Sequence, residues 1–308
     1  MNNRRTLKTD WRGNFVATVT PFDEKGMIDE EKFVNNLKLL MDEGADGFVV
    51  SGCTGESWAM THPERKTLFE LAVNTVANEI PIIAGVSDIL ASDVVALSLD
   101  AKRVGVAGVL VLPPYFALPG RGEVLAHFRS ISEGAECPIM IYNNPRRTGI
   151  NLEPDILKEL AEIDHVVAVK ESSSDFVQTE RTIQDIGDRL AVFTGHSAER
   201  GFAAALMGVD GFVSSGEPQI MGSRALSLWH STVSGELETA RQIQFETLAV
   251  QKALSSVGGS SPADLKAAMN LLGRPGGYPR PPLLPLSQRQ LSDLKANLDS
   301  LGLAGAGG

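Results

Sequence analysis

Short apolar runs alternate with longer amphipathic segments along most of the chain. Each run is rich in branched aliphatic residues and ends in Gly, Pro, Ser or Asn; the runs span residues 14–22, 47–53, 81–87, 108–114, 138–145, 166–172, 191–197 and 211–216. Runs of this kind are typical of strands that are buried on both faces, as in parallel sheets. The pattern therefore predicts eight parallel strands.

The segments between the runs have the period of amphipathic helices. The first carries charged residues on one face and, on the other, the apolar residues Phe33, Leu37, Leu40 and Met41. The second begins at Thr61-His62-Pro63-Glu64, a capping-box spacing with proline in the first turn. Glycine commonly ends a helix, and three of these helical runs end shortly before a strand at Gly44, Gly105 and Gly208.

Eight strand–helix units are compatible with two α/β architectures. A doubly wound sheet usually carries a G-x-G-x-x-G turn after its first strand, and TPFDEKG at residues 20–26 does not match that turn. Evenly spaced units favour a closed (β/α)8 TIM barrel instead, predicted here to occupy residues 1–235.

Residues 236–308 are predicted to form a helical extension packed on the barrel. Helical patterns cover about 237–256 and 262–272, and a turn-rich segment follows at 273–285. A last amphipathic helix is indicated by leucines at helical spacing: Leu291, Leu294, Leu298 and Leu301. The final Gly-Ala-Gly-Gly is expected to be disordered.

Composition narrows the class of protein. The 308 residues are 43% hydrophobic and 21% charged, as in ordinary globular proteins, and carry a formal net charge of -10. Nucleic acids and anionic membranes do not attract such a surface, so neither is expected as a partner. The chain has only two cysteines and no CxxC pair, so no disulfide is predicted. Its opening lacks a signal-like apolar segment, and no apolar run reaches the ~18–20 residues of a membrane span, so a cytoplasmic protein is predicted.

The carboxyl ends of the strands are where TIM barrels place their active sites. Lys170 stands there, directly after the apolar run 166–169. Burial disfavours an ammonium group and lowers its pKa, which yields the neutral amine that attacks a carbonyl to form a Schiff base. A lysine paired with a neighbouring carboxylate is the alternative interpretation.

Two further motifs lie at the ends of other strands. Tyr142 stands at the level of Lys170 on the adjacent strand, either as a general acid–base or as a packed amphipathic ring. In the turn at residues 52–56, GCTGE, glycines let successive backbone N–H groups converge into a nest for a carboxylate, and Thr54 offers a relay hydroxyl. A tight turn with a helix cap explains the same pattern.

Arg147 follows in the loop after the fifth strand, where its guanidinium suits a second carboxylate unless it is simply a surface arginine. The five histidines show no metal-binding spacing, so no metal is predicted: His62, His127, His165, His196 and His230.

Three of these motifs together resemble the dihydrodipicolinate synthase/N-acetylneuraminate lyase family: G-x-x-G-E at 52–56, Y-N-x-P-x-R-T-G at 142–149 and K-E at 170–171. The likeness runs from about residue 14 to 301 and includes VTPFDEKG (19–26) and PPYFALP (113–119). It implies a TIM barrel, a class I mechanism without metal or other cofactor, and a homo-oligomer, either a dimer or a tetramer.

The resemblance also implies roles for individual residues. Lys170 matches the lysine that forms a Schiff base with pyruvate or another 2-oxo acid, and Tyr142 matches the proton-shuttling tyrosine. Cys53 and Thr54 match the pair whose backbone holds the 2-oxo acid carboxylate; Cys53 replaces the second threonine of the synthases. The remaining matches are Arg147, which receives the carboxylate of the aldehyde, and two positions whose backbones line the pocket, Gly195 and Val213.

One position departs from the synthase pattern. Synthases of lysine biosynthesis usually carry a second tyrosine after the fourth strand, which reaches into a neighbouring subunit's site, and here Phe116 stands in its place. A phenyl ring passes no proton, so aldolases, dehydratases and deaminases of hydroxylated 2-oxo acids, such as sialic acid or 2-keto-3-deoxy sugar acids, are retained as alternatives to the synthase. A barrel that only senses a keto acid is the alternative of another class.

Overall fold

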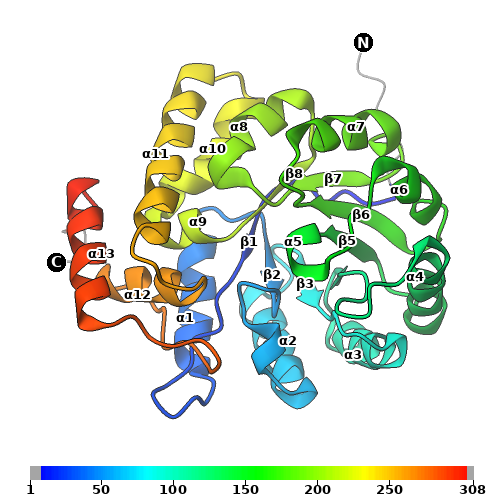
Figure 1. The fold of residues 1–308 in the computed structure, drawn as a ribbon, viewed down its shortest axis with the longest axis horizontal. Helices are drawn as coiled ribbons and strands as arrows, with labels where there is room; N and C mark the ends of the chain where they lie inside the picture. Colours follow the sequence, from blue (N-terminus) through cyan, green and yellow to red (C-terminus); the bar gives the residue numbers. More distant parts are fainter. Residues whose placement is uncertain (1–7, 304–308) are drawn as a thin grey trace.

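The computed structural model describes residues 8–303, and its strands form a closed barrel (Figure 1). The strands are β1 (Gly13–Ala17), β2 (Gly47–Val50), β3 (Ile82–Gly85), β4 (Gly108–Val111), β5 (Ile139–Asn143), β6 (Val166–Glu171), β7 (Ala191–Thr194) and β8 (Gly211–Ser214). Each pairs in parallel with its neighbours in sequence, and β8 closes the sheet on β1. The predicted (β/α)8 barrel is confirmed. The final Gly-Ala-Gly-Gly, predicted to be disordered, lies outside the described residues.

Helices connect successive strands and surround the barrel. They are α1 (Glu30–Asp42), the 3₁₀ helix η1 (Ser57–Ala59), α2 (His62–Val76), α3 (Ala91–Val104), α4 (Arg121–Ala135), α5 (Pro145–Thr148), α6 (Pro154–Leu160), α7 (Phe176–Ile186), α8 (Ser197–Met207), α9 (Gly216–Met221) and α10 (Ser223–Val233). The capping box at Thr61 and Glu64 starts α2 as predicted. Gly105 and Gly208 end α3 and α8 in the left-handed region, where glycine is unstrained.

The first predicted strand is longer than the observed one. The apolar run spans residues 14–22, but β1 ends at Ala17. The residues beyond it are apolar because they enter other contacts: Val19 joins the apolar cluster of the helical extension, and Phe22 forms isolated bridges with Ile28 and Tyr278. Hydrophobicity alone does not distinguish these loop residues from strand residues.

The core has an inner and an outer layer. Inside the barrel, Phe15, Phe193 and Val213 pack with other inward-facing residues, and a second layer lies between the strands and the helices. Trp11, just before β1, belongs to the inner layer at the amino-terminal end of the barrel. A Cβ atom on Gly108 would lie 2.4 Å from the Trp11 ring, so the indole needs glycine at that position.

Three helices extend the barrel at the carboxyl terminus: α11 (Leu237–Ser255), α12 (Ala263–Leu271) and α13 (Gln288–Ser300). Figure 1 shows them, in yellow to red, along one side of the barrel, and α11 packs on α8 and α10. Of the leucines predicted for the last helix, Leu294 and Leu298 are buried, whereas Leu301 lies just beyond α13. A division of the chain at residue 235 into barrel and extension remains a proposal. No helix within residues 8–303 is long and apolar enough to cross a membrane.

Candidate active site

Lys170 and Tyr142 lie side by side because β5 and β6 are neighbouring parallel strands in register. The two residues are direct partners in the ladder, and Lys170 Nζ lies 4.1 Å from the centroid of the Tyr142 ring. Each residue is only 6% exposed. The side chains therefore meet at the carboxyl end of the barrel, where the sequence pattern predicted them.

The Lys170 amine is buried without a carboxylate partner. Its sequence neighbour Glu171 is engaged elsewhere, since its carboxylate accepts hydrogen bonds from Asn143 Nδ2 at 2.8 Å and from the Ser173 backbone N–H at 2.6 Å. Within residues 8–303, Lys170 Nζ makes no ion pair or hydrogen bond. Burial lowers the pKa of Lys170 to about 8, partly opposed by Cys53 and Glu217. The geometry thus disfavours the alternative of a lysine that simply pairs with a carboxylate.

The Tyr142 hydroxyl is held by a residue that the sequence pattern did not single out. Asn144 Nδ2 donates a hydrogen bond of 2.8 Å to Tyr142 Oη. Burial raises the pKa of the Tyr142 phenol above its usual range, and Asn144 partly opposes that shift. Among the described residues, the Thr54 hydroxyl makes no hydrogen bond to Tyr142, so the proposed relay between them is not formed in this conformation.

The turn after β2 brings Cys53 and Thr54 to the barrel mouth, and both are half-buried. The Glu56 N–H donates to Cys53 O at 3.1 Å and the Ser57 N–H to Gly52 O at 3.2 Å, so the chain curls tightly. Cys53 packs against the inner layer of the core that contains Tyr142. The backbone of this turn therefore lies beside the lysine–tyrosine pair.

Gly195 closes the other side of the pair. Its N–H donates to Glu171 O at 2.9 Å, and a Cβ atom at this position would lie 2.9 Å from Lys170 Cε and collide with Ser172 Oγ. Only glycine leaves room for the lysine. The predicted Val213 lies on β8, in the same inner layer as Tyr142.

A cleft of about 810 Å³ opens above Gly195 and separates the barrel mouth from the helical extension. Its barrel side includes Trp58 and Arg147, and its other side includes Leu254 and Leu265 of the extension. The Arg147 guanidinium is exposed and stacks 5.7 Å from the centroid of the Trp58 ring. Because it pairs with no carboxylate within the described chain, Arg147 is free to receive an anion from the cleft.

A family model described as the dihydrodipicolinate synthetase family matches residues 10–301. The chain belongs to this family. An uncharacterized DapA-like lyase of Rhizobium meliloti is 37% identical over 96% of this chain and 97% of its own length. A 4-hydroxy-tetrahydrodipicolinate synthase of Methanopyrus kandleri is 34% identical over 96% of this chain and 98% of its own.

Solved structures agree with this membership. A dihydrodipicolinate synthase of Bacillus anthracis superposes with a TM-score of 0.89 at 30% identity, over 94% of this chain and 98% of that chain. Membership of the dihydrodipicolinate synthetase family places the protein among lyases.

Phe116, predicted to stand at the position of the synthases' second tyrosine, does not lie at the candidate site of its own chain. It is 90% exposed in the loop after β4 and does not line the cleft. Its backbone has a φ of 69°, an uncommon value for a residue with a side chain. The loop therefore presents the ring to solvent or to another subunit.

Besides Asn144, two polar residues near the site were not predicted from the sequence: Ser172 and Glu217. Ser172 Oγ is buried against Gly195, and the Ser172 hydroxyl, like Asn144, partly opposes the rise in the pKa of Tyr142. Glu217 is buried in the cleft wall, hydrogen-bonded to the Ser197 hydroxyl, and burial raises its pKa. Both follow strands and face the mouth, so applying the strand-end rule to every polar residue would have found them.

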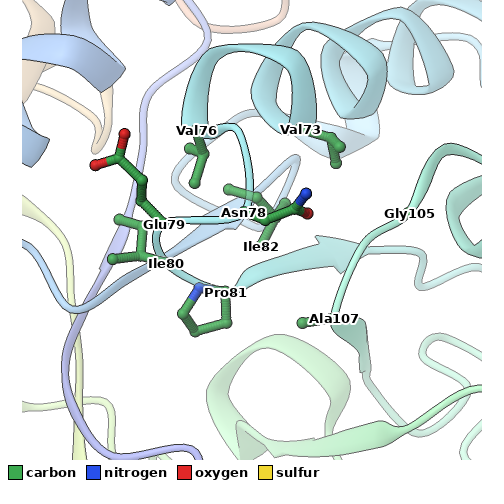
Figure 2. Close-up of a pocket in the computed structure, with 9 residues that line it drawn as sticks. All are labelled: Val73, Val76, Asn78, Glu79, Ile80, Pro81, Ile82, Gly105 and Ala107. Carbon is green, nitrogen blue, oxygen red and sulfur yellow. The ribbon is translucent and has the colours of Figure 1, made fainter.

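A second hollow, of about 290 Å³, lies at the opposite end of the barrel (Figure 2). It is lined by Val73, Val76, Asn78, Glu79, Ile80, Pro81, Ile82, Gly105 and Ala107. These residues come from α2 and from the segments that lead into β3 and β4, where barrel residues serve stability rather than catalysis. Within residues 8–303, no group of His, Cys, Asp and Glu is arranged to hold a metal ion.

Proposed function

We propose that the protein is a Schiff-base-forming lyase that acts on pyruvate or a related 2-oxo acid. The observation that carries the proposal is the buried Lys170 amine, which has no ion-pair partner in the described chain and lies against the Tyr142 ring. An unpaired amine with a lowered pKa is a nucleophile near neutral pH. A sensor without turnover would have no need of such an amine.

The proposed reaction begins when neutral Lys170 Nζ attacks the carbonyl carbon of the 2-oxo acid. Loss of water from the protonated carbinolamine gives a protonated imine, and loss of a proton from the adjacent carbon then gives the neutral enamine. Tyr142 is the proposed group that carries protons to and from these atoms, with Thr54 as its relay partner. The backbone at Cys53 and Thr54 is proposed to bind the carboxylate, and Gly195 and Val213 to line the pocket.

The identity of the second substrate distinguishes the synthases from the aldolases, dehydratases and deaminases of the family. The free Arg147 guanidinium in the cleft favours an aldehyde that carries a carboxylate, so a condensation of the 4-hydroxy-tetrahydrodipicolinate synthase type ranks first. Phe116 and Cys53, which depart from the synthases, favour an aldolase or a dehydratase/deaminase of a hydroxylated 2-oxo acid. No metal or other cofactor takes part in the proposed chemistry.

Borohydride trapping tests the proposal. Incubation with pyruvate and borohydride is expected to attach a reduced pyruvyl group to Lys170, detected by peptide mass spectrometry, and Lys170→Ala is expected to abolish both adduct and activity. Lys266 is a matched internal control, because burial also lowers its pKa to about 8 but its amine is enclosed by hydrogen bonds. An adduct at Lys266 or at surface lysines instead of Lys170, or full activity of Lys170→Ala, would refute the proposal.

A panel of co-substrates then separates the branches. Consumption of pyruvate with aspartate semialdehyde would identify a synthase. Release of pyruvate from 2-keto-3-deoxy sugar acids, sialic acid or 4-hydroxy-2-oxoglutarate would identify an aldolase. Loss of water or ammonia from the substrate would identify a dehydratase or a deaminase.

A further inference from the structure

The turn that presents Cys53 and Thr54 is bounded by two residues in an uncommon backbone conformation. Ser51 and Glu56 have φ values of 57° and 55°, in the left-handed region, although neither is glycine. Side chains other than Gly, Asn and Asp rarely adopt this region unless the surrounding structure holds them there. The contacts of Glu56 therefore bear on the shape of the turn.

Glu56 is held by a lysine of the helical extension. Its fully buried carboxylate pairs with the fully buried Lys266 Nζ of α12, 210 residues later in the sequence. The other carboxylate oxygen accepts the Arg280 backbone N–H at 2.9 Å. Both oxygens of Glu56 thus contact residues from outside the eight strand–helix units.

The remaining N–H groups of Lys266 donate hydrogen bonds to two neighbouring loops, one of which is the loop after β1. Lys266 Nζ donates to Thr20 O at 2.6 Å and to Tyr278 O at 2.9 Å, which with Glu56 accounts for three N–H groups. The Thr20 hydroxyl in turn donates to Gly55 O at 2.8 Å. One ammonium group therefore fixes the turn after β2 both directly and through the loop after β1.

The turn has little freedom to move apart from these contacts. A Cβ atom on Gly55 would lie 3.1 Å from Thr18 O, so the chain is tightly packed at that point. The Glu56 N–H donates to Cys53 O, so a displacement of Glu56 shifts the backbone at Cys53 and Thr54.

We propose that Lys266 is a positioning residue for the 2-oxo acid: by holding Glu56 it fixes the backbone N–H groups of Cys53 and Thr54 that receive the carboxylate. This inference rests on the proposed function. It makes α12, which lies outside the barrel, a support of the substrate site.

A purely structural role for the ion pair is the competing explanation, and a binding measurement separates the two. The test variant is Lys266→Met combined with Glu56→Gln, which leaves no unpaired buried charge. Borohydride trapping is measured against pyruvate concentration. The half-saturating concentration is expected to rise about tenfold or more, while the rate at saturation changes less than about threefold, because a misplaced anion nest weakens binding rather than chemistry.

The matched control is Arg274→Met combined with Glu43→Gln. Arg274 also joins the extension to the barrel, through hydrogen bonds of 2.7 and 2.5 Å to the Glu43 carboxylate, but it does not touch the turn. Its half-saturating pyruvate concentration is expected to match the wild type, whatever its melting temperature. Should the test variant fail to fold, Glu56→Gln alone retains one acceptor oxygen and is expected to shift half-saturation in the same direction by about threefold.

The outcomes are distinguishable. A wild type that is never trapped at Lys170 overturns the proposed function and, with it, this inference. If the wild type is trapped normally, two results overturn the positioning role alone. Either the test variant has the same half-saturating pyruvate concentration as the wild type, or the control variant shifts this concentration as much as the test variant does.

Discussion

Within residues 8–303, two lysines are buried, Lys170 and Lys266, and their surroundings give them different chemistry. Lys266 Nζ donates hydrogen bonds to two carbonyl oxygens and pairs with a carboxylate. Lys170 Nζ lies over an aromatic ring and has no hydrogen-bond partner in the described chain. Burial lowers the pKa of each to about 8. Only the amine without partners can form a new bond, so burial alone does not identify the nucleophile.

The pH dependence of imine formation follows from this environment. Because only neutral Lys170 attacks a carbonyl, trapping at low pyruvate should accelerate about tenfold from pH 6 to 7 and level off above pH 8, given a pKa of about 8. The measurement is the borohydride trapping rate as a function of pH at a fixed, subsaturating pyruvate concentration. A rate that still climbs tenfold between pH 9 and 10 would mean that Lys170 titrates like an exposed lysine.

Part of this site could be predicted from the sequence. Lys170 and Tyr142 end adjacent parallel strands, so their proximity follows from the topology. The hydrogen bond from Asn144 to the phenol could not be predicted, because it depends on the direction of a side chain in a loop. Neither could the partner of Lys266, since 210 residues separate it from Glu56.

At the scale of elements, the local sequence predicts the first residue of a helix more accurately than the last residue of a strand. The apolar runs locate all eight strands, but they overestimate strands whose apolar residues continue into a loop, as after β1. Helix α2, in contrast, begins at its predicted capping box. Caps are local hydrogen bonds encoded by a few residues, whereas strand ends depend on tertiary contacts.

The cap of α2 gives a stability prediction. Thr61 Oγ1 accepts the Glu64 backbone N–H, and Glu64 reaches back to the Thr61 N–H at 2.8 Å. Thr61→Ala should lower the free energy of unfolding by about 1 kcal/mol. Thr67→Ala, in the interior of the same helix, should change it by less than about 0.5 kcal/mol. Denaturant titration of both variants checks this, and equal losses would show that the cap does not stabilise α2.

At the scale of the whole molecule, large apolar residues are exposed on the loops that follow β3 and β4. Leu90, Phe116 and Leu118 are 60%, 90% and 60% exposed. Phe116 and Leu118 also have positive φ angles, which hold their loop in an uncommon shape. Large apolar side chains that are exposed to this degree are common at contact surfaces between proteins.

We therefore expect the protein to self-associate through these loops, as a dimer or a tetramer. Sedimentation velocity should show a species larger than a monomer, and Phe116→Ser should shift the population toward smaller species. Phe245→Ser is the control, since Phe245 is 59% exposed but belongs to α11 of the extension. Dissociation by Phe245→Ser but not by Phe116→Ser would place the subunit contact on the extension instead.

The Trp11 indole at the amino-terminal end of the barrel has a consequence for the order of events during turnover. Because the barrel interior is packed between that ring and Lys170, the amine is approached from the carboxyl end of the barrel, near the cleft beside Gly195. For the proposed reaction, this arrangement implies that the 2-oxo acid binds to Lys170 before the second substrate occupies the cleft. A second substrate that occupied the cleft first would block the 2-oxo acid, so a large excess of it is expected to slow the proposed reaction.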